Sequence, residues 1–133
     1  MTNTFVKKYE RVSLDTGLTM GTSLKGHLLA RYCDLVAILG EPEECDGYKV
    51  SGEWCFRTPE GECVTLYDWK STNLYDPDYP SVAEFRASTE FQEFNVGGHT
   101  SVAASDFIQA LADELARRES LRISDRRVIS SLI

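Results

Sequence analysis

Two alternating segments, residues 48–57 and 62–70, constrain the fold most, because Thr58-Pro-Glu-Gly61 stands between them. Both segments are rich in aromatic and β-branched residues, and a connection with Pro and Gly is typical of a turn, so we predict an antiparallel hairpin. We expect Arg57 to pair with Glu62. That register predicts a strongly aromatic face made of Val50, Trp54, Phe56, Cys63, Thr65, Tyr67 and Trp69. The opposite face would be mixed, with Lys49, Glu53, Arg57, Val64, Leu66, Asp68 and Lys70.

Helical spacing of apolar residues predicts two main helices. The first covers residues 31–39, where Gly40 and Pro42 end it, and its buried face would carry Tyr32, Leu35, Val36 and Leu39. The second and longest covers residues 101–118, with an apolar stripe made of Ala104, Phe107, Ile108, Leu111 and Leu115. A strand at residues 90–96 precedes it, and we expect Phe91 to face away from Phe94 and Val96.

Together these elements predict an α+β fold: an antiparallel sheet with a central hairpin, and two main helices packed on it. The first 15 residues hold at most a weak strand, and residues 71–81 form a long loop with Tyr75 and Tyr79. We predict a single domain over residues 1–118 and an extension over 119–133, a candidate oligomerisation element. Ser124 or Asp125 is a candidate cap for a last short helix, whose apolar end packs either on the chain's own core or on a neighbouring subunit.

The composition is that of an ordinary globular protein of one domain, with 133 residues, 42% of them hydrophobic and 26% charged. No apolar run has the roughly 18 residues of a membrane span, and the first ten residues are polar and charged, so we predict no membrane association and a cytoplasmic location. Cys33, Cys45, Cys55 and Cys63 include no close C-x-x-C pair, so we expect buried or half-buried thiols, not a zinc site or disulfides.

The net charge of −7 is unevenly distributed. Residues 1–30 carry four basic and two acidic groups, whereas residues 31–93 carry five basic and fourteen acidic groups. The acidic middle would repel a phosphate polymer, which argues against binding along DNA or RNA. A single small anion needs only a local pocket of donors and stays possible.

Two glycine-bounded segments are candidate phosphate sites. Gly97-Gly98-His99-Thr100 precedes the longest helix, where free backbone N–H groups and the helix dipole suit an anion, and His99 and Thr100 add side-chain donors. In the polar loop Gly21–Gly26, the donors are Thr22, Ser23 and Lys25. The alternative is that the glycines only allow a sharp strand-to-helix turn and a hydroxyl caps the helix.

The aromatic side of the hairpin is a second candidate for ligand binding. Aromatic planes stack on nucleobases, which contributes about 1–3 kcal/mol per base, and Trp54, Tyr67 and Trp69 would share this face with Lys70 nearby. Tyr75 and Tyr79 could cover such a site. The alternative is that the face packs under the helices, which we favour for Trp54.

Catalytic motifs are scarce. The chain has two histidines, and His99-Thr100-Ser101 has only a superficial likeness to the H-x-T/S motif of phosphoesterases, which use two copies. No metalloprotease or serine-hydrolase motif and no metal-type carboxylate spacing is present. We therefore predict that the protein is not an enzyme and has no metal site and no cofactor.

Several motifs in order resemble a family of small phage-encoded anti-defence proteins of the anti-CBASS type, which act as nucleotide sponges. The resemblance runs from Gly21 to Leu115 and rests on Gly21-Thr-Ser-Leu-Lys-Gly26, Gly40-Glu-Pro42, Lys49 with Glu53-Trp54, Val64-Thr-Leu-Tyr-Asp-Trp-Lys70 and Val96-Gly-Gly98. The chain departs from the family at the hairpin turn, where Glu60-Gly61 replaces Asp-Gly, in a longer region 71–88, and in the tail after Arg118. The longer loop leaves the identity of the ligand open, and the tail leaves the assembly open.

The resemblance implies a protein of the host cytoplasm that binds a cyclic dinucleotide or related nucleotide second messenger without cleaving it, as a homo-oligomer, often a tetramer. It implies that Thr22, Ser23, Lys25 and residues 97–100 take the phosphates, with Lys70 adding charge, and that bases stack on Tyr67, Trp69 or a loop tyrosine. Two rival classes remain: an acidic inhibitor of a host protein that uses the edges at 41–46 and 60–62, and a phosphodiesterase or lyase that degrades the signal.

Overall fold

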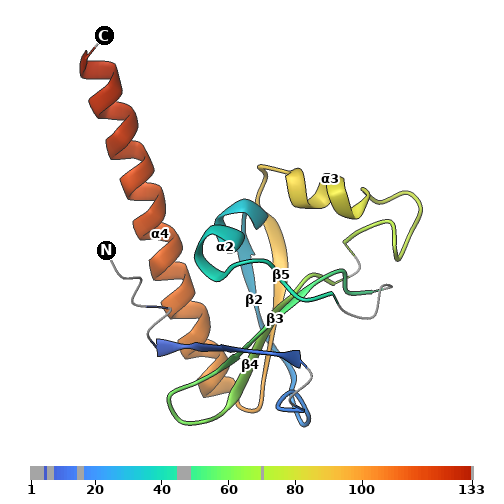
Figure 1. Cartoon of the computed structure of the whole chain (residues 1–133). Helices are drawn as coiled ribbons and strands as arrows, with labels where there is room; N and C mark the ends of the chain where they lie inside the picture. The colour runs from blue at the N-terminus through green and yellow to red at the C-terminus, as the bar shows by residue number, and fades with distance from the viewer. Residues whose placement is uncertain (1–4, 6–7, 15–16, 45–48, 70, 133) are drawn as a thin grey trace.

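The computed structural model describes residue 5 and residues 8–14, 17–44, 49–69 and 71–132, with the side chains of the last helix described as far as Leu121. Within these residues the chain forms an antiparallel sheet of five strands and three helices (Figure 1). In chain order they are β1 (Glu10–Val12), β2 (Ser23–Ala30), α2 (Tyr32–Leu39), β3 (Glu53–Arg57), β4 (Cys63–Tyr67), α3 (Val82–Ala87), β5 (Gln92–Gly98) and α4 (Ser101–Leu132). The predicted α+β class is confirmed. No helix in this part of the chain combines the length and apolar character needed to cross a membrane.

The strands lie in the order β1-β3-β4-β5-β2, so the predicted hairpin β3–β4 is central and β1 and β2 form the two edges. One face of the sheet packs against all three helices. There Trp54 contacts Tyr32 of α2, Phe94 contacts Phe85 of α3, and Phe56 contacts Phe107 of α4. Trp54 is 1% exposed and is therefore part of the core, as we favoured.

The predicted register of the hairpin is wrong by one residue: Arg57 pairs with Cys63, not with Glu62. Thr58 pairs with Glu62 instead, because the Thr58 N–H donates to the Glu62 carbonyl at 2.8 Å and Gly61 has a φ of +84°. The connection is thus a three-residue loop closed by a left-handed glycine, not a four-residue turn.

The change of register moves every β4 side chain to the other face relative to β3. Trp54 and Phe56 share the core face with Val64 and Leu66. The opposite face, which we call the outer face, carries Glu53, Cys55, Arg57, Cys63, Thr65 and Tyr67. The single aromatic face predicted for the hairpin therefore does not exist.

Helix α2 and its end are confirmed. Gly40 closes the helix at a φ of +83°, and its N–H donates to the Val36 carbonyl at 2.8 Å. Glycine adopts this positive φ without steric strain, because it has no Cβ. The Gly40 carbonyl accepts from the Trp54 indole N–H at 2.8 Å, so the helix end is joined to the centre of the sheet.

Two features of the helices differ from the prediction. Helix α3 directly follows the predicted loop 71–81 and begins with a capping box, in which Ser81 Oγ accepts from the Glu84 N–H at 3.1 Å and Glu84 binds the Ser81 N–H in return. The Ser81-x-x-Glu84 spacing was the sequence signal for it. Helix α4 continues to Leu132 as one helix and does not restart near Ser124.

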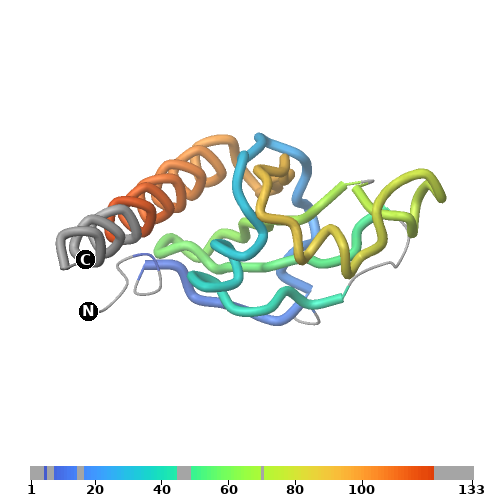
Figure 2. Tube along the Cα trace, turned by 90° about the horizontal axis from the view of Figure 1, so that it is seen from above, coloured from blue at the N-terminus to red at the C-terminus, as the bar shows by residue number. Residues whose placement is uncertain are grey.

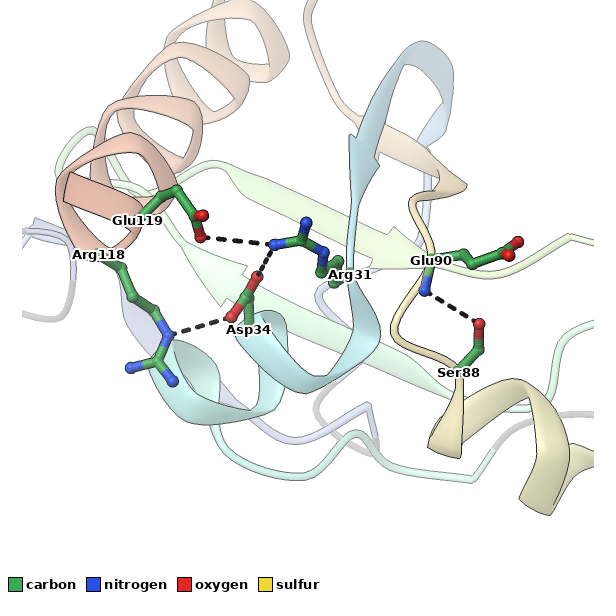
Figure 3. Close-up of polar contacts among 6 residues, drawn as sticks. All are labelled: Arg31, Asp34, Ser88, Glu90, Arg118 and Glu119. Carbon is green, nitrogen blue, oxygen red and sulfur yellow. Dashed lines mark hydrogen bonds and ion pairs between the residues drawn. The ribbon is translucent and has the colours of Figure 1, made fainter. Parts of the chain in front are cut away.

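A polar cluster attaches α4 to the junction of β2 and α2 (Figure 3). Asp34, 7% exposed, accepts from the Arg118 Nε at 3.2 Å and lies 3.8 Å from Arg31, whose guanidinium reaches Glu119 at 3.4 Å. Asp34 is buried, and the two arginines supply the pairing that a buried carboxylate needs. The cluster therefore adds polar contacts to the packing of α4 on this part of the fold.

The cysteines fit the prediction in part. Cys55 and Cys63 are buried on the outer face, with their sulfur atoms 3.4 Å apart, but Cys33 is exposed. Cys45 lies outside the described residues.

Candidate functional site

The two glycine-rich segments, whose spatial relation the sequence left open, do come together. Strand β2 pairs with β5 so that Ser23 lies opposite Gly98 and Leu24 opposite Gly97. We call this region, made of residues 21–25 and 97–100, the glycine corner. It contains most of the predicted ligand-binding residues.

The glycine corner is not a pair of loops, however. Residues from Ser23 belong to strand β2, and Gly97 and Gly98 are the last residues of β5, paired with β4 on one side and β2 on the other. The backbone there is engaged in the sheet and does not form the open turn that was expected. Gly97 is required by packing: an added Cβ would lie 2.7 Å from Thr65 Oγ1.

The side-chain donors of the glycine corner have partners within the chain. Thr22 Oγ1 donates to the Thr19 carbonyl at 2.6 Å, and Lys25 Nζ donates to Ser23 Oγ at 2.8 Å. Thr100 Oγ1 accepts from the Ala103 N–H at 3.1 Å, so it caps α4, the alternative reading of this segment.

His99 joins the glycine corner to the start of β4 and to the turn before β2. Its Nδ1 accepts from the Cys63 N–H at 3.2 Å, and its Nε2 lies 2.9 Å from the Met20 carbonyl. Because a backbone N–H can only donate, the ring proton must lie on Nε2, which donates to Met20. Both ring nitrogens are thus used to hold the turn before β2 against β4.

The predicted aromatic residues lie beside this corner. Tyr67 is half-buried on the outer face, 6.4 Å from the Trp69 ring at 76°, and Trp69 is 44% exposed. Burial raises the pKa of Tyr67, while its hydrogen bond to Asn95 acts in the opposite direction. Lys70, the last predicted ligand-binding residue, lies outside the described residues.

A cavity lies at the opposite edge of the sheet from β2. It has a volume of about 630 Å³, within the usual range of small-molecule sites. We call it the β1 pocket, because it is enclosed by β1 and the residues before it, the end of α2, and the hairpin turn. Its lining is Phe5, Lys8, Tyr9, Glu10, Arg11, Ile38, Leu39, Phe56, Arg57, Thr58, Pro59 and Gly61.

The base of the β1 pocket is aromatic and firmly packed. Phe5 and Tyr9 stack with ring centroids 4.9 Å apart, and Phe5 also meets the edge of Phe56 at 5.7 Å. All three rings are 3% exposed. Burial raises the pKa of Tyr9, with further contributions from Asp106 and Glu60, so its phenol is neutral.

The rim of the β1 pocket is cationic. Lys8, Arg11 and Arg57 face a single acidic residue, Glu10, in a chain with a net charge of −7. Arg11 is held in place by the carbonyls of Leu39 at 3.1 Å and Glu41 at 2.9 Å, and burial lowers its pKa against the opposing effect of Glu43. Arg57 pairs with Glu10 at 3.5 Å, and both side chains are largely exposed.

This pocket was missed by the sequence reasoning. Its described lining comes from three regions that are distant in the chain: residues 5 and 8–11, residues 38–39, and residues 56–59 with residue 61. The signal in the sequence is the basic excess of residues 1–30 together with Phe5 and Tyr9. The loop with Tyr75 and Tyr79, the expected lid, lies at the opposite end of the sheet from the hairpin turn (Figures 1 and 2).

No protein-family model matches the chain, and no curated protein matches it either.

Proposed function

We propose that this protein binds a cyclic nucleotide or related nucleotide signal in the β1 pocket and holds it without cleaving it. The observation that carries the proposal is the combination of a 630 Å³ cavity, an aromatic base and a cationic rim in an acidic protein. A nucleotide has two matching parts. Its nucleobase suits the aromatic floor of the pocket, and its phosphate suits the cationic rim.

The chemistry of the lining supports this ligand class. Arginine is the side chain best suited to phosphate, because its planar guanidinium offers paired donors. Arg57 gives up only a largely exposed ion pair with Glu10 when it binds a phosphate, which costs little. Tyr9 and Phe56 line the cavity and would form an apolar floor under a nucleobase.

The biological role is proposed from the resemblance to the phage sponge family. A protein that sequesters an immune signal in the host cytoplasm needs affinity and abundance and no general base. The same resemblance supports a homo-oligomer, with a tetramer favoured.

The test is a ligand panel. Purified protein is incubated with cyclic di- and trinucleotides and cyclic ADP-ribose isomers, thermal shift is measured, and the ligand released by heat is analysed by chromatography. A shift with intact ligand supports the proposal. A shift with altered ligand identifies an enzyme, and no shift across the panel rejects nucleotide binding and favours a host-protein target.

A further inference from the structure

Strand β2 is an edge strand with exposed apolar side chains. Strand β2 has eight residues and is last in the strand order. Among the described residues, no segment pairs with the edge of β2 that faces away from β5. Leu24 is 50% exposed and Leu29 is 64% exposed. An edge of this length with unpaired backbone groups and apolar side chains is a ready template for another strand.

Both leucines lie on the outer face of the sheet, away from α4. Leu24 is opposite Gly97, whose missing side chain would point at Thr65 on that face. Leu29 alternates with Leu28 and Ala30, which are buried under the helices. The β-bulge between Leu24 and Gly26 keeps the two leucines on one face although they are five positions apart.

We propose that β2 pairs antiparallel with β2 of a second copy of this chain, around a twofold axis at His27. A twofold axis perpendicular to the sheet preserves the faces, so His27 lies opposite His27 of the second copy and Gly26 opposite Leu28. Leu29 then lies opposite the bulge that carries Leu24. The two leucines of each copy meet those of the other in one apolar cluster.

Charges at this edge of the sheet are also complementary to those of a second copy. Lys25 lies in the bulge, and Glu93 lies on β5 opposite Leu29. The antiparallel pairing brings Lys25 of each copy toward Glu93 of the other, which places opposite charges together twice. The result is a continuous sheet of ten strands, which removes the β2 edge from solvent.

This interface is independent of the proposed function. The β1 pocket lies at the other edge of the sheet, so pairing through β2 leaves it open in both copies. Nucleotide binding and self-association can therefore fail separately.

The first test is sedimentation velocity over a wide range of concentrations, with Leu29→Glu and the charge-matched control Val102→Glu. Val102 is 71% exposed at the start of α4 and does not belong to strand β2. We expect a dimer, or a tetramer built from such dimers, in the wild type and the control. Leu29→Glu should raise the dimer dissociation constant at least about tenfold, because it replaces apolar contact by a charge in the cluster.

The second test is a crosslink that only this register allows. In a Cys33→Ser background, His27→Cys places two thiols opposite each other on the twofold axis, within disulfide range. Diamide oxidation should give a covalent dimer, whereas Val102→Cys in the same background should not. A wild type that is monomeric at all concentrations, or a dimer that resists Leu29→Glu and gives no crosslink, overturns the proposal.

Discussion

The glycine corner and the β1 pocket differ in how they are built. The corner looks like a ligand site in the sequence, yet Gly97 and Gly98 pack between strands and the described donors Thr22, Ser23, Lys25 and His99 have partners within the chain. The pocket has no motif, yet it brings three cations and three aromatic rings around an open volume. A glycine motif can be required by packing between strands as well as by ligand binding. A pocket needs several segments that fold together.

The largest expected effect separates the two regions by affinity. In the double variant Arg57→Gln and Lys8→Gln, the affinity for the nucleotide found in the panel should fall by at least about a hundredfold, because each of the two charge-assisted contacts contributes about 1.5–3 kcal/mol. Isothermal titration calorimetry measures it. Arg117→Gln, on the exposed side of α4, is the control, and an unchanged affinity in the double variant would remove the pocket from consideration.

A second prediction concerns stability at the glycine corner. Gly97→Ala should lower the free energy of unfolding by about 2 kcal/mol, because the added Cβ meets Thr65 Oγ1 at 2.7 Å. Urea denaturation measures this. Adding Thr65→Ala should restore part of the loss, and nucleotide affinity of the folded protein should not change. A stable Gly97→Ala variant that no longer binds nucleotide would support the original phosphate site instead.

A third prediction uses the donors of the glycine corner. Thr22→Val and Lys25→Gln remove side chains that donate to Thr19 and Ser23 and lie outside the β1 pocket, so each should change nucleotide affinity less than about twofold and stability by about 0.5 kcal/mol or less. Calorimetry and urea denaturation measure both. A loss of tenfold or more, on the order of 1.4 kcal/mol, would show that these side chains contact the ligand.

The smallest expected effect is spectroscopic. Trp54 is buried in the core and Trp69 is exposed beside the glycine corner, and neither lines the β1 pocket. Saturation with nucleotide should therefore leave tryptophan emission nearly unchanged. Strong quenching that disappears in Trp69→Phe would place the ligand at the glycine corner.

Local patterns predicted much of the fold. The stripe of α2 with Gly40 at its end, the stripe at the start of α4, and the strand before it follow from side-chain periodicity, which the backbone geometry imposes directly. The hairpin was recognised, but its register depended on whether Gly61 adopts a left-handed conformation, and the sequence alone did not decide that. One residue of difference reassigned the faces of Trp54 and Tyr67.

The candidate site was not predictable in the same way. Arg57 and Tyr9 are 48 positions apart in the chain. They line the same pocket because β1 pairs with β3, which places Glu10 opposite Arg57. The glycine segments were correctly singled out as special. For Gly97 the reason is the close approach of Thr65, which follows only from the pairing of β4 with β5.

The most direct test of the central claim is an NMR titration of ¹⁵N-labelled protein with the nucleotide that gives the largest thermal shift. We expect the amide signals of Arg11, Arg57, Thr58 and Gly61 to move on binding, while those of Ser23, Gly97 and Gly98 stay in place. Shifts centred on the glycine corner, with the β1 pocket unaffected, would contradict it.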